Sequence, residues 1–147
     1  MNFLDSWSPR LLSVMRVIVA LMYLEHGTMK LFHFPTAQMP GALPLILVLA
    51  AWIELIIGVF LVVGLFTKLS ALIASGEMAV GYFGFHVLNA FHMLPPTTPV
   101  SFDPQVNHGA EAALYAIVFL YIASAGGGAW ALDAIFNRKR GLEPAAA

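Results

Sequence analysis

Four apolar stretches, each close to the roughly 20 residues needed to cross a bilayer, fill most of this chain. They run from about 11 to 31, 43 to 66, 69 to 91 and 109 to 125. One glutamate interrupts each stretch: Glu25, Glu54, Glu77 and Glu111. An ionisable side chain at membrane depth costs roughly 2.5–3.5 kcal/mol on insertion scales. We therefore expect these carboxyl groups to face one another inside a bundle of helices.

The composition indicates the same class of protein. The chain has 147 residues, of which 60% are hydrophobic and 10% are charged, whereas soluble domains carry about 25% charged residues. We predict an all-α, integral membrane four-helix bundle that forms a single domain in the lipid bilayer. The net charge of -1 gives no indication of a nucleic-acid partner. The absence of cysteine excludes disulfides and thiolate ligands within this chain.

The basic residues predict the orientation. With four spans, both termini and the turn between the second and third spans share one side. That side would carry Arg10, Lys68 and the basic run 138–140, whereas the other side would carry Lys30. The positive-inside rule then places both termini in the cytoplasm. We predict a multi-pass protein of the bacterial inner (cytoplasmic) membrane.

The C-terminal segment is expected to leave the bundle. Gly126, Gly127 and Gly128 predict a break or bend after the fourth span. The next residues combine Trp130 and Phe136 with basic charge, which is typical of an interfacial helix. We predict a short interfacial helix here.

The polar residues are expected to lie at different depths along the predicted spans. At about 1.5 Å per residue, Arg16 and Glu77 both lie roughly 20 Å below the outer face, which predicts a structural ion pair between them. The other polar residues gather nearer the outer face, with Glu54 closer to the midplane. We call this predicted ligand site the polar cluster; its members are Glu25, His26, Lys30, Glu54, His86, His108 and Glu111.

Three chemistries would use such a cluster. A metal site is disfavoured, because di-iron bundles repeat a Glu-x-x-His pair, whereas His108 and Glu111 have the reverse order and occur once. A proton or solute path along the glutamates is a second option, although four short helices leave little room for alternating access. The structural alternative is a hydrogen-bonded network that fixes helix packing.

A quinone is the third option. A quinone head group needs a hydrogen-bond donor and a proton source inside an apolar pocket, and the polar cluster offers both. Aromatic residues lie near the same depth, although aromatics at a membrane interface are ordinarily anchors and those inside a bundle are ordinarily packing. They are Tyr23, Trp52, Tyr82, Phe83, Phe85 and Tyr115.

Four ordered blocks carry a family resemblance. They are EHGTMKL (25–31), WIELIIGVFLVVGLFTK (52–68), SGEMAVGYFGFH (75–86) and NHGAEAALYAIVFLYIASAGGGAWALD (107–133). This arrangement resembles the DoxX family of small bacterial membrane proteins across nearly the whole chain. The resemblance implies a four-helix membrane protein with an early arginine, here Arg16. The family's patterns G-x-x-K, E-x-x-x-G and G-L-x-T correspond to Gly27 and Lys30, to Glu54 and Gly58, and to Gly64, Leu65 and Thr67.

The resemblance also bears on function. Members have been linked to thiosulfate:quinone oxidoreductase and to membrane-associated oxidoreductase complexes that answer oxidative stress. The absence of cysteine counts against a sulfur-handling role that needs a protein thiol. The sequence thus favours an accessory subunit of a redox-linked membrane complex, with quinone as the candidate cofactor, no metal, no assigned catalytic residue, and other membrane subunits or self-association as partners. The alternative is a purely structural or assembly subunit without a ligand; a stand-alone oxidoreductase is a third hypothesis.

Overall fold

The computed structural model describes residues 3–37, 41–89, 95, 97 and 100–139. Within these residues the chain is entirely helical, without strands, as predicted. The elements are α1 (Phe3–Phe32), α2 (Leu45–Val63), α3 (Thr67–Val80), the π-helix η1 (Gly81–Val87), α4 (Ala110–Ala125) and α5 (Leu132–Lys139).

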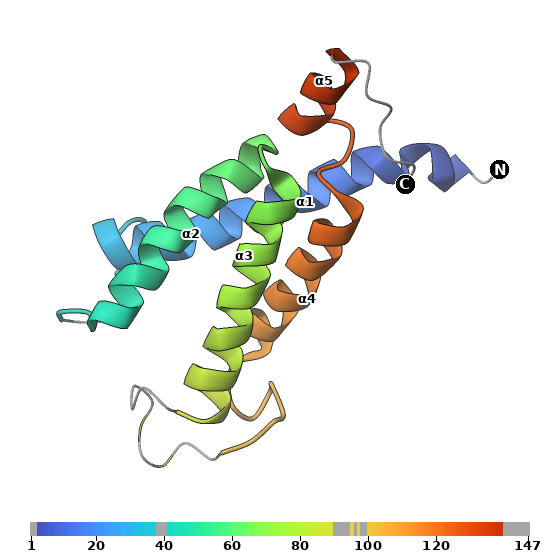
Figure 1. Cartoon of the computed structure of the whole chain (residues 1–147). Helices are drawn as coiled ribbons and strands as arrows, with labels where there is room; N and C mark the ends of the chain where they lie inside the picture. Colours follow the sequence, from blue (N-terminus) through green and yellow to red (C-terminus); the bar gives the residue numbers. More distant parts are fainter. Residues whose placement is uncertain (1–2, 38–40, 90–94, 96, 98–99, 140–147) are drawn as a thin grey trace.

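The long helices pack as two pairs. The most extensive contacts join α1 to α2 and α3 to α4, whereas the contact of α2 with α3 is smaller and that of α1 with α4 is slight. Figure 1 shows α3 and α4 side by side, with α1 crossing at a marked angle to them. We call the end with the α2–α3 connection the turn end, and the opposite end, with the loops after α1 and η1, the outer end. The weak contact between the pairs leaves space for a cavity.

Among the described residues, two helices are long and apolar enough to cross a membrane, α1 and α2. In the most apolar 18-residue stretch of each helix, 22% of the residues are buried within the protein, so most residues there keep part of their surface exposed. α4 is a shorter apolar helix of 16 residues. The third stretch is divided: α3 has 14 residues and η1 continues it for 7.

The helix boundaries differ from the predicted ones mainly in the first stretch. α1 begins at Phe3 rather than near residue 11, so Pro9 lies inside the helix and not in its first turn. Polar residues such as Asp5 lower the hydropathy of this segment without opposing a helix, which explains the late predicted start. The predicted fourth stretch agrees with α4 within one residue. The predicted end of the third span, residue 91, and the basic residue Arg140 lie outside the described residues.

Glycines bring α1 and α2 together. A Cβ added to Gly27 would lie 2.9 Å from the Ala51 carbonyl oxygen and 2.9 Å from the Leu55 backbone nitrogen. A Cβ added to Gly58 would lie 3.0 Å from the Cβ of Leu24. Small residues at these positions allow the close backbone approach that stabilises helix pairs in membranes.

Arg16 joins α1 to the end of α2 and to the segment after α4 at the turn end. Its Nε donates to the Gly127 carbonyl at 2.8 Å, and its Nη1 donates to the carbonyls of Val62, at 2.7 Å, and Leu61. The side chain is 1% exposed. These carbonyls belong to the last turn of α2 and to the segment after α4, where helix geometry leaves acceptors unpaired. The buried cation is therefore satisfied by backbone dipoles.

The predicted ion pair between Arg16 and Glu77 is not formed. A Cβ on Gly64 would lie 3.1 Å from the Arg16 guanidinium carbon, so Arg16 reaches the level at which α3 begins. Glu77 lies ten residues further along α3, or about 15 Å at helical rise, and its carboxyl group accepts a hydrogen bond from Tyr23. The depth estimate placed the two at one level because it ran the third span to residue 91, whereas the described helix η1 ends at Val87, which brings Glu77 nearer to that end of the protein.

The C-terminal segment folds back onto the α2–α3 turn. Gly126 and Gly128 have positive φ values of 91° and 78°, which confirms the predicted bend. Asp133 in α5 accepts hydrogen bonds from the backbone N–H groups of Phe66, at 2.9 Å, and Thr67, at 2.7 Å. The predicted short C-terminal helix is present as α5, and Asp133 caps the start of α3.

Candidate functional site

A cavity of about 920 Å³ lies between the two helix pairs. Pockets for small molecules commonly measure about 300–1,000 Å³, so this cavity is large enough for an organic ligand. Its polar lining side chains come from α1, α2, α3, η1 and α4 and from the segment that precedes α4: His26, Lys30, Glu54, Glu77, His86, His108, Glu111 and Tyr115.

The apolar wall of the cavity reaches the surface of the protein. Several lining residues of α2 and α3 are also among the exposed apolar side chains: Ile46, Leu49, Ile53, Leu72, Ile73 and Val80. The cavity therefore opens sideways between α2 and α3, through a surface made of aliphatic side chains. A ligand with an apolar tail has a path out of the cavity along this surface.

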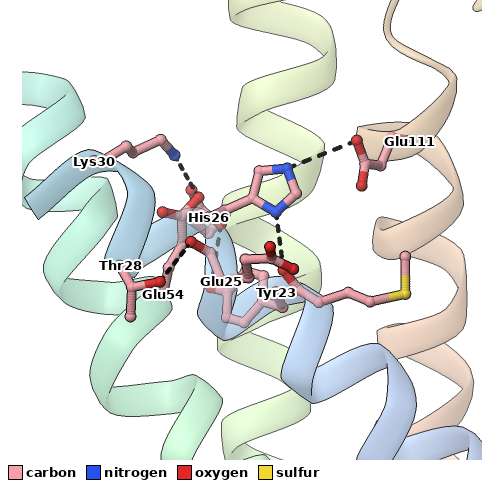
Figure 2. Close-up of polar contacts among 9 residues, drawn as sticks. Tyr23, Glu25, His26, Thr28, Lys30, Glu54 and Glu111 are labelled. Carbon is pink, nitrogen blue, oxygen red and sulfur yellow. Dashed lines mark hydrogen bonds and ion pairs between the residues drawn. The ribbon is translucent and has the colours of Figure 1, made fainter. Parts of the chain in front are cut away.

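Lys30 and Glu54 form a buried ion pair on the cavity wall. Lys30 Nζ donates to Glu54 Oε1 at 2.5 Å, and the two side chains are 10% and 0% exposed. Figure 2 shows Lys30 extending from α1 toward Glu54 on α2. The second carboxylate oxygen, Glu54 Oε2, is buried and has no hydrogen-bond partner within the described structure. The pair thus holds one acceptor that the protein itself does not satisfy.

Glu77 and Tyr23 form a second polar contact. The Tyr23 hydroxyl donates to Glu77 Oε2 at 3.2 Å, and the Tyr23 ring packs edge-on against Phe119 in the core. Glu77 lines the same cavity as Lys30 and Glu54. Glu77 is therefore part of the cavity wall that also holds the Lys30–Glu54 pair.

His26 links α1 to α4 at the outer end. Its Nδ1 lies 2.9 Å from the Met22 carbonyl oxygen, which only accepts, so Nδ1 carries the proton. Its Nε2 lies 3.6 Å from Glu111 Oε2, as the dashed line in Figure 2 shows. The Tyr115 hydroxyl donates to Glu111 Oε1 at 3.1 Å. A proton held at His26 Nε2 or on Glu111 makes this contact attractive.

The π-helix positions His86. Within η1, Tyr82 donates to the Phe102 carbonyl at 2.6 Å, and His86 Nδ1 lies 3.1 Å from the Asn107 carbonyl oxygen. Asn107 is fully buried. These contacts fasten residues 101–109 to η1. π-Helical turns occur often at functional sites, and this one turns His86 toward the cavity.

The structure gathers six of the seven members of the polar cluster around the cavity: His26, Lys30, Glu54, His86, His108 and Glu111. Glu25 is the exception. It is exposed and does not line the cavity, because its neighbour His26 faces inward and adjacent helical residues point about 100° apart.

Sequence reasoning missed two polar groups of the wall. Glu77 was assigned to Arg16, and Tyr115 was considered only as an aromatic. The i, i+4 spacing of Glu111 and Tyr115 is the signal that would have found the second contact. Across the ranges that the structure describes, no group of three or more His, Asp or Glu side chains is arranged to hold a metal ion.

The helix pairs and the cavity define an all-helical, membrane-type protein with a ligand-sized space between its helices. The sequence model of the DoxX family matches residues 11–87. The chain belongs to the DoxX family. It is also similar to a protein of Haemophilus influenzae described as "Uncharacterized protein", with 38% identity over 143 residues that cover 95% of this chain and 100% of that protein. No solved structure matches the chain.

Proposed function

We propose that this protein is an accessory subunit of a redox-linked membrane complex and that its cavity holds a quinone-type ligand. The observation that carries the proposal is the combination of an aliphatic wall open to the side with convergent carboxylate, imidazole and ammonium groups. A quinone has the same division, a polar ring and an apolar tail. Membership of the DoxX family supports a redox-linked role by analogy.

The proposal includes four membrane crossings. Besides α1 and α2, the continuous helix of α3 and η1 and the apolar α4 supply the remaining two. At the turn end, the Pro9 carbonyl accepts from the Ala129 N–H at 3.0 Å, and a Cβ on Gly126 would meet the Lys68 side chain at 3.6 Å. The start of α1, the α2–α3 turn and the segment before α5 thus share one side. Arg10, Lys68 and Arg138 on that side favour the cytoplasm of a bacterial inner membrane.

The orientation can be tested by labelling single introduced cysteines, without removing any native residue first. Because the chain has no cysteine, one cysteine introduced at Lys68 and another at Asp103 each give a unique labelling site. We expect a membrane-impermeant maleimide applied to intact spheroplasts to label the Asp103 variant only. Labelling of the Lys68 variant alone would invert the proposed orientation, and labelling of both would contradict four crossings.

Ligand retention tests the function itself. The protein is extracted from bacterial membranes in a gentle detergent, and the bound quinone is measured by organic extraction and chromatography. We expect wild-type protein to retain quinone, and Glu54→Gln and His86→Ala to retain less. Glu25→Gln is the matched control, because that carboxyl group lies outside the cavity. Wild-type protein without quinone, in a stable complex with other membrane proteins, would support the purely structural role instead.

A further inference from the structure

Hydrogen-bond acceptors outnumber donors in the cavity. Three carboxylates line it, Glu54, Glu77 and Glu111, against one permanently cationic side chain, Lys30. Lys30 is held by Glu54 at 2.5 Å and is 10% exposed. Its charge balances that of one carboxylate, and one of its three N–H groups is used by Glu54 Oε1, so the carboxylate oxygens in the wall still outnumber the remaining Lys30 donors.

Two of the cavity histidines, His26 and His86, do not reverse this balance. His86 Nδ1 faces the Asn107 carbonyl and His26 Nδ1 faces the Met22 carbonyl, so these nitrogens carry the protons. At His86 the remaining Nε2 of a neutral imidazole is then an acceptor, whereas Nε2 of His26 is occupied by its contact with Glu111 at 3.6 Å. Glu111 already accepts from Tyr115 and faces His26. The excess of acceptors is therefore concentrated at Glu54 and Glu77.

Glu77 offers the accessible acceptor. Its Oε2 receives the Tyr23 hydroxyl at 3.2 Å, and its partly exposed side chain lines the cavity. Glu54, which also lines the cavity, has a buried and unpaired Oε2. A carbonyl oxygen placed here would meet carboxyl oxygens, which repel it. A hydroxyl group would donate a hydrogen bond, and a bond to the ionised carboxylate is charge-assisted and about twice as strong as a neutral one.

We propose that the cavity selects a ring head group that donates hydrogen bonds, so that the reduced, hydroxyl-bearing quinol binds in preference to the oxidised quinone, with Glu77 as the acceptor. This inference rests on the proposed function, because it concerns the same cavity. It specifies the redox form of the ligand, reduced rather than oxidised, that the cavity binds. The apolar tail of the quinol lies along the aliphatic opening between α2 and α3.

The test compares the two forms of one ligand. Full-length protein in phosphatidylcholine nanodiscs is equilibrated, without oxygen, with decylubiquinol or decylubiquinone, and empty nanodiscs provide the correction for partition into lipid. The bound ligand is quantified by chromatography. We expect wild-type protein to bind the quinol at least about tenfold more tightly, as a hydrogen bond to a charged acceptor provides. Glu77→Gln should reduce this ratio to below about threefold, because the amide replaces a charged acceptor by a neutral one.

Glu25→Gln is the control, since it removes an equal charge outside the cavity and should leave the ratio unchanged. Tyr23→Phe, which frees Glu77 Oε2, should keep or raise the preference for quinol. Equal or tighter binding of quinone by wild-type protein would overturn the inference while leaving the proposed function standing. A quinol preference that survives in a folded Glu77→Gln variant would overturn the role of Glu77. Binding of neither form would refute the proposed function together with the inference.

Discussion

The contact of α1 with α2 at Gly27 gives a quantitative prediction for Gly27→Ala. The added Cβ would meet Ala51 O and Leu55 N, each at 2.9 Å, whereas favourable contacts need about 3.5–4.0 Å. Both obstructing atoms are backbone, so the helices themselves must separate by about 0.5–1 Å. Overpacking costs roughly 1–3 kcal/mol, and the better helix propensity of alanine returns at most about 1 kcal/mol. We expect a net loss of up to about 2 kcal/mol in the free energy of unfolding.

Gly76→Ala is the matched control for this prediction. Gly76 also lies inside a helix, but no atom lies within 4 Å of a Cβ added there. We expect its stability to stay unchanged or to rise by up to about 1 kcal/mol. The assay is unfolding by sodium dodecyl sulfate in mixed micelles, followed by circular dichroism at the helix band. If both variants are equally stable, the close approach of α1 and α2 at Gly27 is refuted.

Three polar contacts can be tested by the same unfolding assay. Lys30→Met should cost roughly 3–5 kcal/mol, because it leaves the Glu54 carboxylate buried without its cation. Lys30→Met combined with Glu54→Gln should recover a large part of that loss, and a double variant weaker than the single one would contradict the pairing. Arg16→Lys should lose roughly 1–3 kcal/mol, since an ammonium group lacks the planar fork that reaches three carbonyls; wild-type stability would argue against that role. Asp133→Ala should lower the free energy of unfolding by roughly 1–2 kcal/mol, because it removes the cap of α3. An unchanged stability would contradict the docking of α5 onto the start of α3.

The sequence was informative about the fold where long apolar stretches set the outcome. Such stretches predict helices because only a helix satisfies its backbone groups in lipid. The extension of α1 back to Phe3 was not predictable from hydropathy, because polar residues interrupt the segment and the contacts at Pro9 and Ser13 are made with the C-terminal segment. One of these is the hydrogen bond from Ala129 N–H to the Pro9 carbonyl. Contacts between residues this far apart in the chain leave no periodic signal.

The sequence indicated which residues gather in the candidate site, but not which of them contact one another. Apolar context was enough to place His26, Lys30, Glu54 and His86 together, because charged groups avoid lipid. The partners of Glu77 and Arg16 depended on how far each helix extends along the bundle. That offset is set by the short α2–α3 turn and by η1, whose π-helical geometry has no clear sequence signature.

The partners of Arg16 are synthesised long after Arg16 itself. The Leu61 and Val62 carbonyls follow it by 45 and 46 residues, and the Gly127 carbonyl follows by 111 residues. At about 5–20 residues per second, the last of these acceptors is made roughly 6–22 seconds after the guanidinium group. Until then, the first helix carries a cation that water, lipid head groups or the insertion machinery must hold. The hydrogen bonds of Arg16 in α1 are thus complete only after Gly127 has been synthesised. A chain that stops before Gly127 leaves an unpaired hydrogen-bond donor in its first helix rather than in its last.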